Sequence, residues 1–136
     1  MMETIKFSKD IKVLYIPAKT FPEGILDAHK KLHSLIPFST DRKSFGISRP
    51  ENGGIAYKAG AEEISRGEAE KLNCQTMILK KGKYTSITIQ DFMKDPDSIG
   101  KTFEKLLANP SIDPEGYCVE WYFNEKDVKC MVRLME

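Results

Sequence analysis

A weak internal repeat restricts how this chain can fold more than any other feature of its sequence. At an offset of 74 residues, four residues of the first half align with identical residues of the second half, namely Pro22 with Pro96, Ile25 with Ile99, Lys31 with Lys105, and Leu32 with Leu106. A repeat of this length is a supersecondary unit that buries its apolar face against its neighbour. We therefore expect two related units, at about residues 1–64 and 72–136.

Each unit contains the same order of elements. Segments with strand-like alternation or β-rich composition lie at residues 11–17, 45–48, 55–59, 76–79, 84–90, 117–123 and 128–134, with a short strand near residues 4–7. Residues 25–36 and 99–107 instead carry apolar side chains at helical spacing. We predict an α+β fold in which two pseudo-symmetric β-β-α-β-β units form one antiparallel sheet. Both helices would cover one face of this sheet, with a groove between them.

The ends of the two helices carry recognisable signals. Thr20 and Glu23 have the spacing of a capping box, and Asp95-Pro96 offers an N-cap followed by a proline at the first helical position. The first helix is expected to end before Pro37, and the second at Asn109-Pro110, because proline disfavours helical backbone at the preceding residue.

Three short polar segments between strands predict turns. Residues 51–54 (Glu-Asn-Gly-Gly) and 81–83 (Lys-Gly-Lys) contain residues that tolerate positive φ, and residues 124–127 are polar. We interpret each segment as the turn of a hairpin.

The composition restricts the class of protein. With 136 residues, 40% of them hydrophobic and 30% charged, the chain is typical of a single soluble domain, which we place at residues 1–136. Its 21 basic and 20 acidic residues lack the basic excess of a nucleic-acid-binding domain. The apolar stretches are far shorter than the roughly 18 residues of a membrane span, and no signal segment is recognisable. We expect a cytoplasmic protein without direct nucleic-acid or membrane binding.

The cysteines and histidines do not form a recognisable metal motif. Cys74, Cys118 and Cys130 leave one thiol unpaired in any disulfide scheme, and their spacing does not match a zinc knuckle, so reduced thiols are favoured. His29 and His33 share one helix face, but zinc would require a third ligand from elsewhere. A structural role or a place at the pocket rim is the better interpretation. Phosphate loops, dinucleotide fingerprints and nucleophile elbows are missing, so we expect no metal, no cofactor and no assigned catalytic residue.

The strand at residues 117–123 surrounds one carboxylate with aromatic residues. Alternation divides this strand into two faces, one with Cys118, Glu120 and Tyr122, the other with Tyr117, Val119, Trp121 and Phe123. If the four-residue face packs in the core, Glu120 points to water. If the three-residue face lines the groove, Glu120 is a buried acid that needs a cationic or hydrogen-bonding partner. The residues by themselves favour the solvated alternative.

Two motifs in the second half resemble the GyrI-like effector-binding family. Gly82-Lys83-Tyr84 matches the family's hairpin, and Glu120-Trp121-Tyr122, which follows after a helix, matches its Glu-x-Tyr strand. This family includes the ligand-binding domains of multidrug-sensing transcription regulators and the gyrase inhibitory protein. The resemblance covers nearly the whole chain. It implies a pseudo-twofold sheet with two helices and a pocket between them for amphipathic, often cationic small molecules.

The resemblance also assigns roles to individual residues. In the family, the glutamate of the Glu-x-Tyr strand pairs with the positive charge of the ligand, and this role falls on Glu120. Tyr122 would offer a hydroxyl and an aromatic ring to the same pocket. Further ligand-binding candidates are Tyr57 and Phe45, on the first-half hairpin where Gly46 replaces the acid, and Tyr15 on the first long strand. Tyr84 is expected to pack as the hairpin anchor.

Three classes of function remain open. The leading hypothesis is a stand-alone small-molecule binding protein for amphipathic, cationic ligands that is linked to transcription regulation or drug response. A preceding helix-turn-helix is not recognisable, so a separate regulator protein or a homodimer is the expected protein partner. The first alternative is a hydrolase of electrophilic small-molecule toxins, with Glu120 as general acid or base. The second is a protein-interaction module similar to the gyrase inhibitory protein.

Overall fold

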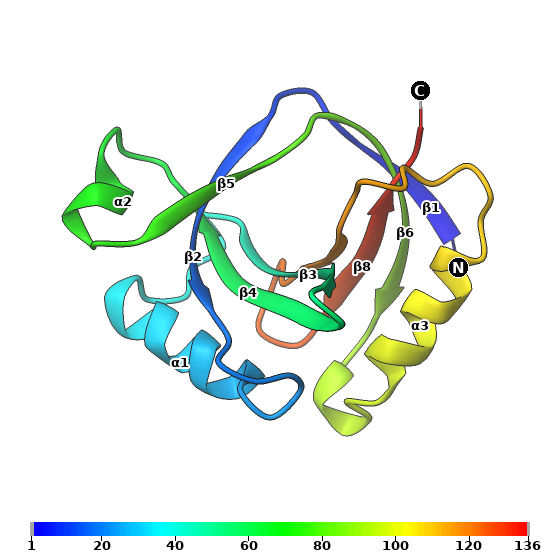
Figure 1. Ribbon diagram of the computed structural model, residues 1–136, viewed down its shortest axis with the longest axis horizontal. Helices are drawn as coiled ribbons and strands as arrows, with labels where there is room; N and C mark the ends of the chain where they lie inside the picture. Colours follow the sequence, from blue (N-terminus) through cyan, green and yellow to red (C-terminus); the bar gives the residue numbers. More distant parts are fainter. Residues whose placement is uncertain (1, 136) are drawn as a thin grey trace.

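The pairing order of the strands defines the architecture of the protein (Figure 1). The computed structural model describes residues 2–135, in which eight strands form one antiparallel sheet in the order β1-β6-β8-β7-β3-β4-β2-β5. The strands are β1 (Met2–Phe7), β2 (Ile11–Pro17), β3 (Ser44–Glu51), β4 (Gly54–Glu62), β5 (Gln75–Leu79), β6 (Gly82–Ile89), β7 (Cys118–Trp121) and β8 (Val128–Arg133). The helices are α1 (Ile25–Leu35), α2 (Glu68–Lys71), the 3-10 turn η1 (Phe92–Lys94) and α3 (Ser98–Leu107). The predicted α+β class and antiparallel sheet are confirmed.

The two units exchange their first strands. β1 pairs with β6 of the second unit, and β5 pairs with β2 of the first unit. The units meet where β3 pairs with β7, and there Gly46 lies directly opposite Glu120. The offset of 74 residues aligns these same two residues, so the pseudo-twofold axis passes through this pair.

One of the three predicted hairpins is wrong. The β3–β4 turn, with φ of 52° at Asn52 and 80° at Gly53, and the β7–β8 turn are both hairpins. The segment at residues 81–83, however, joins β5 to β6, which pair with different strands. Gly82 has a φ of 131°, so the local turn signal was real. Such a signal reports local backbone conformation and not which strand becomes the partner.

Tyr84 stabilises the bend between β5 and β6. Its hydroxyl donates to the carbonyl of Lys80 at 2.7 Å, and its ring lies 5.1 Å from that of Phe7, between centroids. The residue is buried, as expected of an anchor at this position, although it anchors a bend and not a hairpin.

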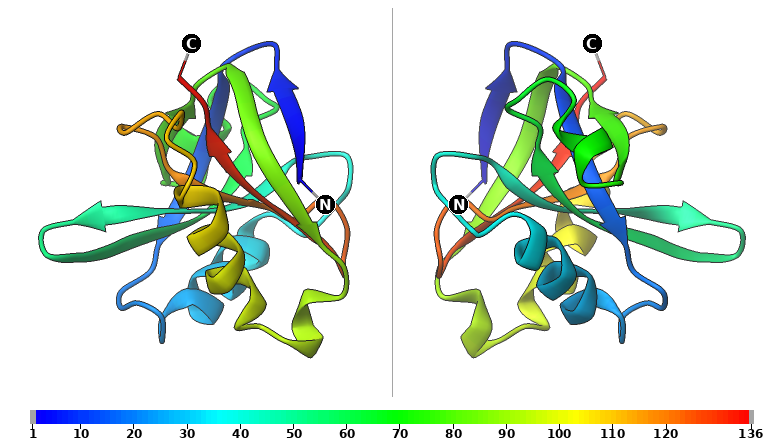
Figure 2. Two further views of the ribbon diagram at one scale, coloured as in Figure 1. Left: turned by 90° about the vertical axis from the view of Figure 1, so that its right-hand side faces the viewer. Right: turned by 90° about the vertical axis from the view of Figure 1, so that its left-hand side faces the viewer.

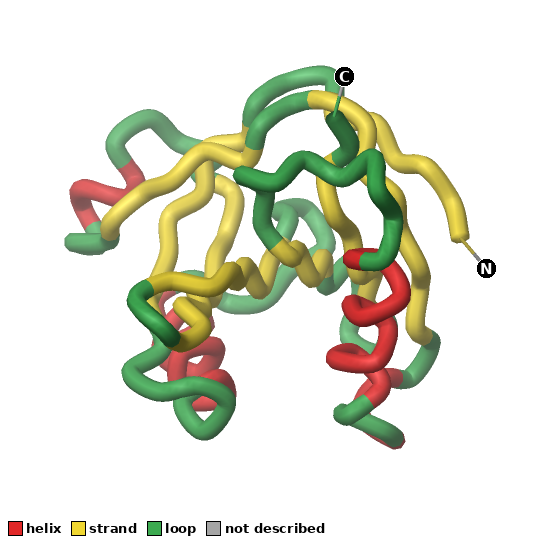
Figure 3. The backbone as a smooth tube through the Cα atoms, turned by 45° about the vertical axis from the view of Figure 1, so that its right-hand side comes forward, coloured by secondary structure: helices red, strands yellow, loops and turns green. Residues whose placement is uncertain are grey.

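Both long helices lie on the same face of the sheet (Figures 1 and 2). α1 packs on β2 and β4, where Ala28 and Leu32 join the cluster around Leu14, whereas α3 packs on β6 and β8 through Phe103 and Leu106. The curled sheet forms an arch, and the helices are its two legs (Figure 3). In residues 2–135, no helix combines the length and the apolar content needed to cross a membrane.

The predicted helix starts are wrong by a few residues. α1 begins after Gly24 and α3 after Asp97, and neither residue makes a side-chain capping bond. The proline-containing segments instead form turns before the helices, because the carbonyl of Thr20 accepts from the Gly24 amide at 3.1 Å and that of Asp95 accepts from the Ser98 amide at 3.0 Å. At its other end, α1 stops at Leu35, ahead of the proline, as predicted.

A third apolar cluster fills the opposite face of the sheet. Phe45 and Ile47 of β3 and Val119 of β7 are almost completely buried there, with Trp121 packed against them. The central strands therefore have one face in this core, and their other face is directed toward the space between the helices.

Candidate functional site

A cavity of about 900 Å³ lies between α1, α3 and the central strands. Its lining residues come from every one of these elements: Ser48, Cys118, Glu120 and Tyr122 from the sheet side, Ile25, Leu26, His29 and His33 from α1, Ile99, Gly100 and Phe103 from α3, and Phe21, Phe38, Ile55, Phe92 and Met93 from neighbouring segments. A mostly apolar lining with a few polar groups is typical of sites for small organic molecules.

Glu120 is directed toward this cavity because its strand neighbours pack on the opposite face. Val119 and Trp121 belong to the cluster of the far face, and alternation places Glu120 and Cys118 on the helix side. The sequence offered two alternatives, a packed four-residue face or a groove-lining three-residue face. In the structure both faces of β7 are covered, so Glu120 is only 7% exposed although its neighbours also pack.

Two tyrosine hydroxyls hold the carboxylate of Glu120. Its Oε1 atom accepts from the hydroxyl of Tyr57 at 2.8 Å and from that of Tyr122 at 2.5 Å. The shorter distance is typical of an O–H donor to an ionised oxygen. Burial raises the pKa of Glu120 above its ordinary value, and the two hydroxyl donors offset part of this rise.

A histidine extends this hydrogen-bonded chain to α1. Nε2 of His29 lies 2.8 Å from the hydroxyl oxygen of Tyr57. Burial, together with the nearby His33, lowers the pKa of His29 to about 4, so the ring is neutral at pH 7. Because Tyr57 donates its proton to Glu120, the network assigns the donor role to Nε2–H of His29. All protons of the chain are thus directed toward the carboxylate.

Gly46 provides the space that the carboxylate occupies. A Cβ atom at this position would lie 2.5 Å from Oε1 of Glu120 and would overlap the hydroxyl of Tyr57. Real Cβ atoms essentially never approach other atoms this closely, so only glycine fits while both side chains keep their positions. The glycine that aligns with the acid in the first unit is therefore a requirement for the acid in the second.

The charged groups around the cavity are acidic. Glu23, Asp97 and Glu125 lie at its rim and are exposed, whereas Glu120 lies at its buried end. Among residues 2–135, no lysine or arginine lines the cavity. Clefts lined by one sign of charge and apolar walls concentrate ions of the opposite sign, so the cavity attracts cations.

The structure brings together three of the five predicted ligand-binding residues. Glu120 and Tyr122 line the cavity, and Tyr57 is buried behind them, in contact with Glu120. Phe45 is completely buried in the core of the opposite face, because it lies one residue from Gly46 and strand alternation turns it away. Tyr15 also lies outside the cavity. The prediction that Phe45 and Tyr15 belong to the same pocket is corrected.

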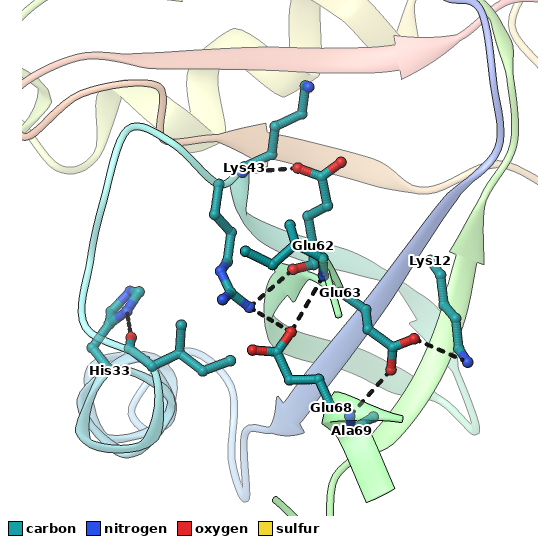
Figure 4. Close-up of polar contacts among 10 residues, drawn as sticks. Lys12, His33, Lys43, Glu62, Glu63, Glu68 and Ala69 are labelled. Carbon is teal, nitrogen blue, oxygen red and sulfur yellow. Dashed lines mark hydrogen bonds and ion pairs between the residues drawn. The ribbon is translucent and has the colours of Figure 1, made fainter. Parts of the chain in front are cut away.

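Tyr15 lines a second, polar cavity of about 590 Å³ beside α2. There its hydroxyl donates to Oε1 of Gln75 at 2.7 Å. Glu63 receives the Nζ atom of Lys12 at 3.3 Å and the backbone amide of Ala69 at 3.1 Å (Figure 4). These polar groups pair with each other and hold α2, an element that the sequence pattern did not predict, against the sheet.

The role of His29 was only partly predictable from the sequence. Its helical spacing relative to Ile25 and His33 indicated a shared face, which does line the cavity. The partner Tyr57 lies 28 residues away, and no local signal connects the two residues. The cavity wall from α3 was likewise recognisable only as an apolar stripe.

The histidine pair does not gather further metal ligands. The rings of His29 and His33 stack with centroids 6.3 Å apart, and Nδ1 of His33 donates to the carbonyl of Ile36 at 3.0 Å (Figure 4). Within the described part of the chain, no group of three or more His, Cys, Asp or Glu side chains is arranged to hold a metal ion. The Cys118 thiol lines the cavity, and burial raises its pKa to about 11, so the thiol is protonated at neutral pH.

Comparisons with known proteins identify the fold. No protein-family model matches the sequence, and no curated protein matches it either. Among solved structures, an integron cassette protein from the mobile metagenome of Vibrio cholerae is similar with a TM-score of 0.73 and 13% identity, covering 98% of this chain and 95% of that one. The structure of SAV2435 bound to tetraphenylphosphonium has a TM-score of 0.65 and 10% identity, covering 98% and 94%. A hydrolase from Listeria innocua has a TM-score of 0.52 and 8% identity, covering 98% and 90%. At these identities the likeness shows a shared fold.

Proposed function

We propose that this protein binds amphipathic organic cations in the cavity between α1 and α3, as a member of the GyrI-like effector-binding family. The observation that carries the proposal is the buried carboxylate of Glu120, at the end of an apolar cavity whose other charged groups are also acids. An ionised carboxylate is costly to bury, and a cationic partner offsets this cost.

The aromatic side chains of the cavity support the same class of ligand. Tyr122 lines the cavity, and its ring lies 5.3 Å from that of Phe92 and 5.4 Å from that of His29, between centroids. Aromatic faces attract cations through their quadrupole and also contribute apolar contact area. The shared fold with SAV2435, whose structure contains tetraphenylphosphonium, agrees with this proposal.

The direct test is to titrate wild-type protein and Glu120→Gln with tetraphenylphosphonium, following heat by calorimetry and Trp121 fluorescence. Glutamine keeps the shape and an acceptor for both tyrosines but removes the charge. We expect the affinity to fall by about tenfold or more in Glu120→Gln, as for loss of a desolvated ion pair. Equal affinity of the two proteins would contradict the proposed role of Glu120.

A matched control is Glu125→Gln at the exposed rim of the same cavity. Because solvent screens its charge, this variant is expected to retain affinity within about threefold. Thermal unfolding of all three proteins confirms that each is folded during the titration.

A further inference from the structure

The two oxygens of the Glu120 carboxylate have different environments. Oε1 accepts from both tyrosine hydroxyls, which together use the two lone pairs of that oxygen. Among residues 2–135, the structure gives Oε2 no hydrogen-bond donor. The buried side-chain atoms without a partner are Ser86 Oγ and Ser98 Oγ, and Oε2 is not one of them. Oε2 is therefore the oxygen that stays accessible from the cavity.

The hydrogen-bonded chain behind Glu120 cannot supply the missing donor. The proton of Tyr57 is directed to Oε1, and the oxygen of Tyr57 is engaged by Nε2 of His29. The proton of Tyr122 is directed to the same Oε1. A buried acceptor without a donor is unfavourable, so an occupant of this cavity gains most if it brings an N–H or O–H group of its own.

The remainder of the cavity determines what else the occupant must carry. Four apolar side chains at the rim are 41% to 66% exposed, namely Phe21, Leu26, Ile55 and Met93. Apolar surface lies toward the solvent, and the acid lies at the buried end. An amphipathic ligand therefore fits with its charged end at Glu120 and its apolar body along the rim.

We propose that the ligand is a protonated amine that donates an N–H to Oε2 of Glu120, so that the cavity selects ammonium ions over cations that lack an N–H. This inference rests on the proposed function. It specifies the substrate class further, because charge and size alone would treat a protonated amine and a quaternary cation of similar bulk alike.

A methylation series tests the role of the N–H bond. The probes are 2-(1-naphthyl)ethylamine and its N-methyl, N,N-dimethyl and N,N,N-trimethyl derivatives, titrated calorimetrically at pH 7.5, where the three amines are protonated. The number of N–H bonds falls to zero only at the last methylation, whereas bulk rises by one methyl group at each step. We expect similar affinities for the first three probes and a drop of about tenfold or more at the fourth, the size of a lost charge-assisted hydrogen bond.

The outcomes separate this inference from the proposed function. A smooth trend through the series, or tight binding of the trimethyl probe, overturns the N–H inference while leaving a cation site that depends on Glu120. Failure of every probe and of tetraphenylphosphonium to bind overturns both proposals. Tyr15→Phe is the matched control, because Tyr15 lies in the second cavity, and it is expected to leave the whole series unchanged. In Glu120→Gln the step at the last methylation is expected to disappear.

Discussion

The two units of this protein share one backbone plan but provide different chemistry to the cavity between them. At the central strand pair the first unit contributes Gly46 and the second Glu120. The strand partner of Gly46 is Ala59, two residues after Tyr57, whereas the partner of Glu120 is Cys130, two residues after Val128. The first unit thus offers a tyrosine hydroxyl where the second offers an apolar side chain.

The helices continue the same contrast. His29 of α1 extends the hydrogen-bonded chain to Glu120, while Phe103, its counterpart at the offset of 74 residues, packs in the apolar cluster under α3. One unit supplies donors, and the other supplies the acid and an apolar wall. Near a twofold axis, equivalent side chains approach the same space, so a site with one buried charge requires that the repeat be broken there.

The largest effect is expected when the broken symmetry is removed at Gly46. In Gly46→Ala the new methyl group overlaps the Tyr57 hydroxyl and crowds Glu120, so both side chains must shift. We expect the free energy of unfolding to fall by about 3 kcal/mol and cation binding to be lost. Chemical denaturation measures the first and calorimetry the second. Gly54→Ala, where nothing lies within 4 Å of the added atom, is the control. If both variants are equally stable, Gly46 has no steric role.

The next effect concerns the donor side of the cavity and depends on pH. The folded-state pKa of His29 is about 4, below the 6.5 of an unperturbed histidine, so the unfolded chain binds this proton first as the pH falls. The corresponding stability is present above pH 6.5 and is lost toward pH 4, by about 2 kcal/mol between pH 7 and pH 5.

Glu120 acts in the opposite direction, because its raised pKa makes the folded protein take up a proton before the unfolded chain does. The comparison is therefore made in the Glu120→Gln background. Denaturation curves between pH 5 and pH 7 are expected to show the acid-induced loss with His29 present and not in the double variant His29→Gln/Glu120→Gln. Parallel pH profiles for the two proteins would contradict a buried neutral histidine.

A smaller effect is expected when the acid itself is neutralised. Because Glu120 is buried and its pKa is raised, its ionised form destabilises the unliganded protein, and this cost grows as the pH rises above 4.5. We expect Glu120→Gln to be more stable than wild type by about 1 kcal/mol at pH 8, with little difference at pH 4. Urea denaturation at both pH values measures this. A less stable Glu120→Gln at pH 8 would show that the charge stabilises the fold.

The smallest effect is expected at the second tyrosine. Tyr122→Phe removes one donor that lowers the pKa of Glu120, so more of the acid is protonated at a given pH. Cation affinity is expected to fall by about threefold to tenfold, and more at pH 6 than at pH 8. Tyr117→Phe, on the opposite face of the sheet, is the control for this titration. A loss of affinity that does not depend on pH would indicate a contact role for Tyr122 alone.

The fold was largely predictable because it follows from local patterns. Strand alternation, helical stripes and the repeat indicate elements and their order, and the exposed turn at Asn52 and Gly53 had the expected positive φ. The bend at Gly82 was not predictable, because the same backbone signal suits a hairpin and a crossing between two sheet edges. The helix starts were misplaced because competing turns formed before each helix.

The site was predictable only around Glu120. Alternation placed Glu120 and Tyr122 on one face, and the structure places both in the cavity. Phe45 had the same composition signal as Tyr57, yet a shift of one residue along a strand moves a side chain to the opposite face. Sequence could not fix that register, because it depends on which strand lies beside it.

The sequence by itself determined the repeat, the alternation that separates Glu120 from Trp121, and the acid opposite a glycine. The tertiary structure decided that Glu120 is buried and hydrogen-bonded, because residues 29, 57 and 120 come from three elements that only the pairing of β3 with β7 and the packing of α1 bring together. Local propensities depend on neighbouring residues in the chain, whereas burial and pKa depend on neighbours in space.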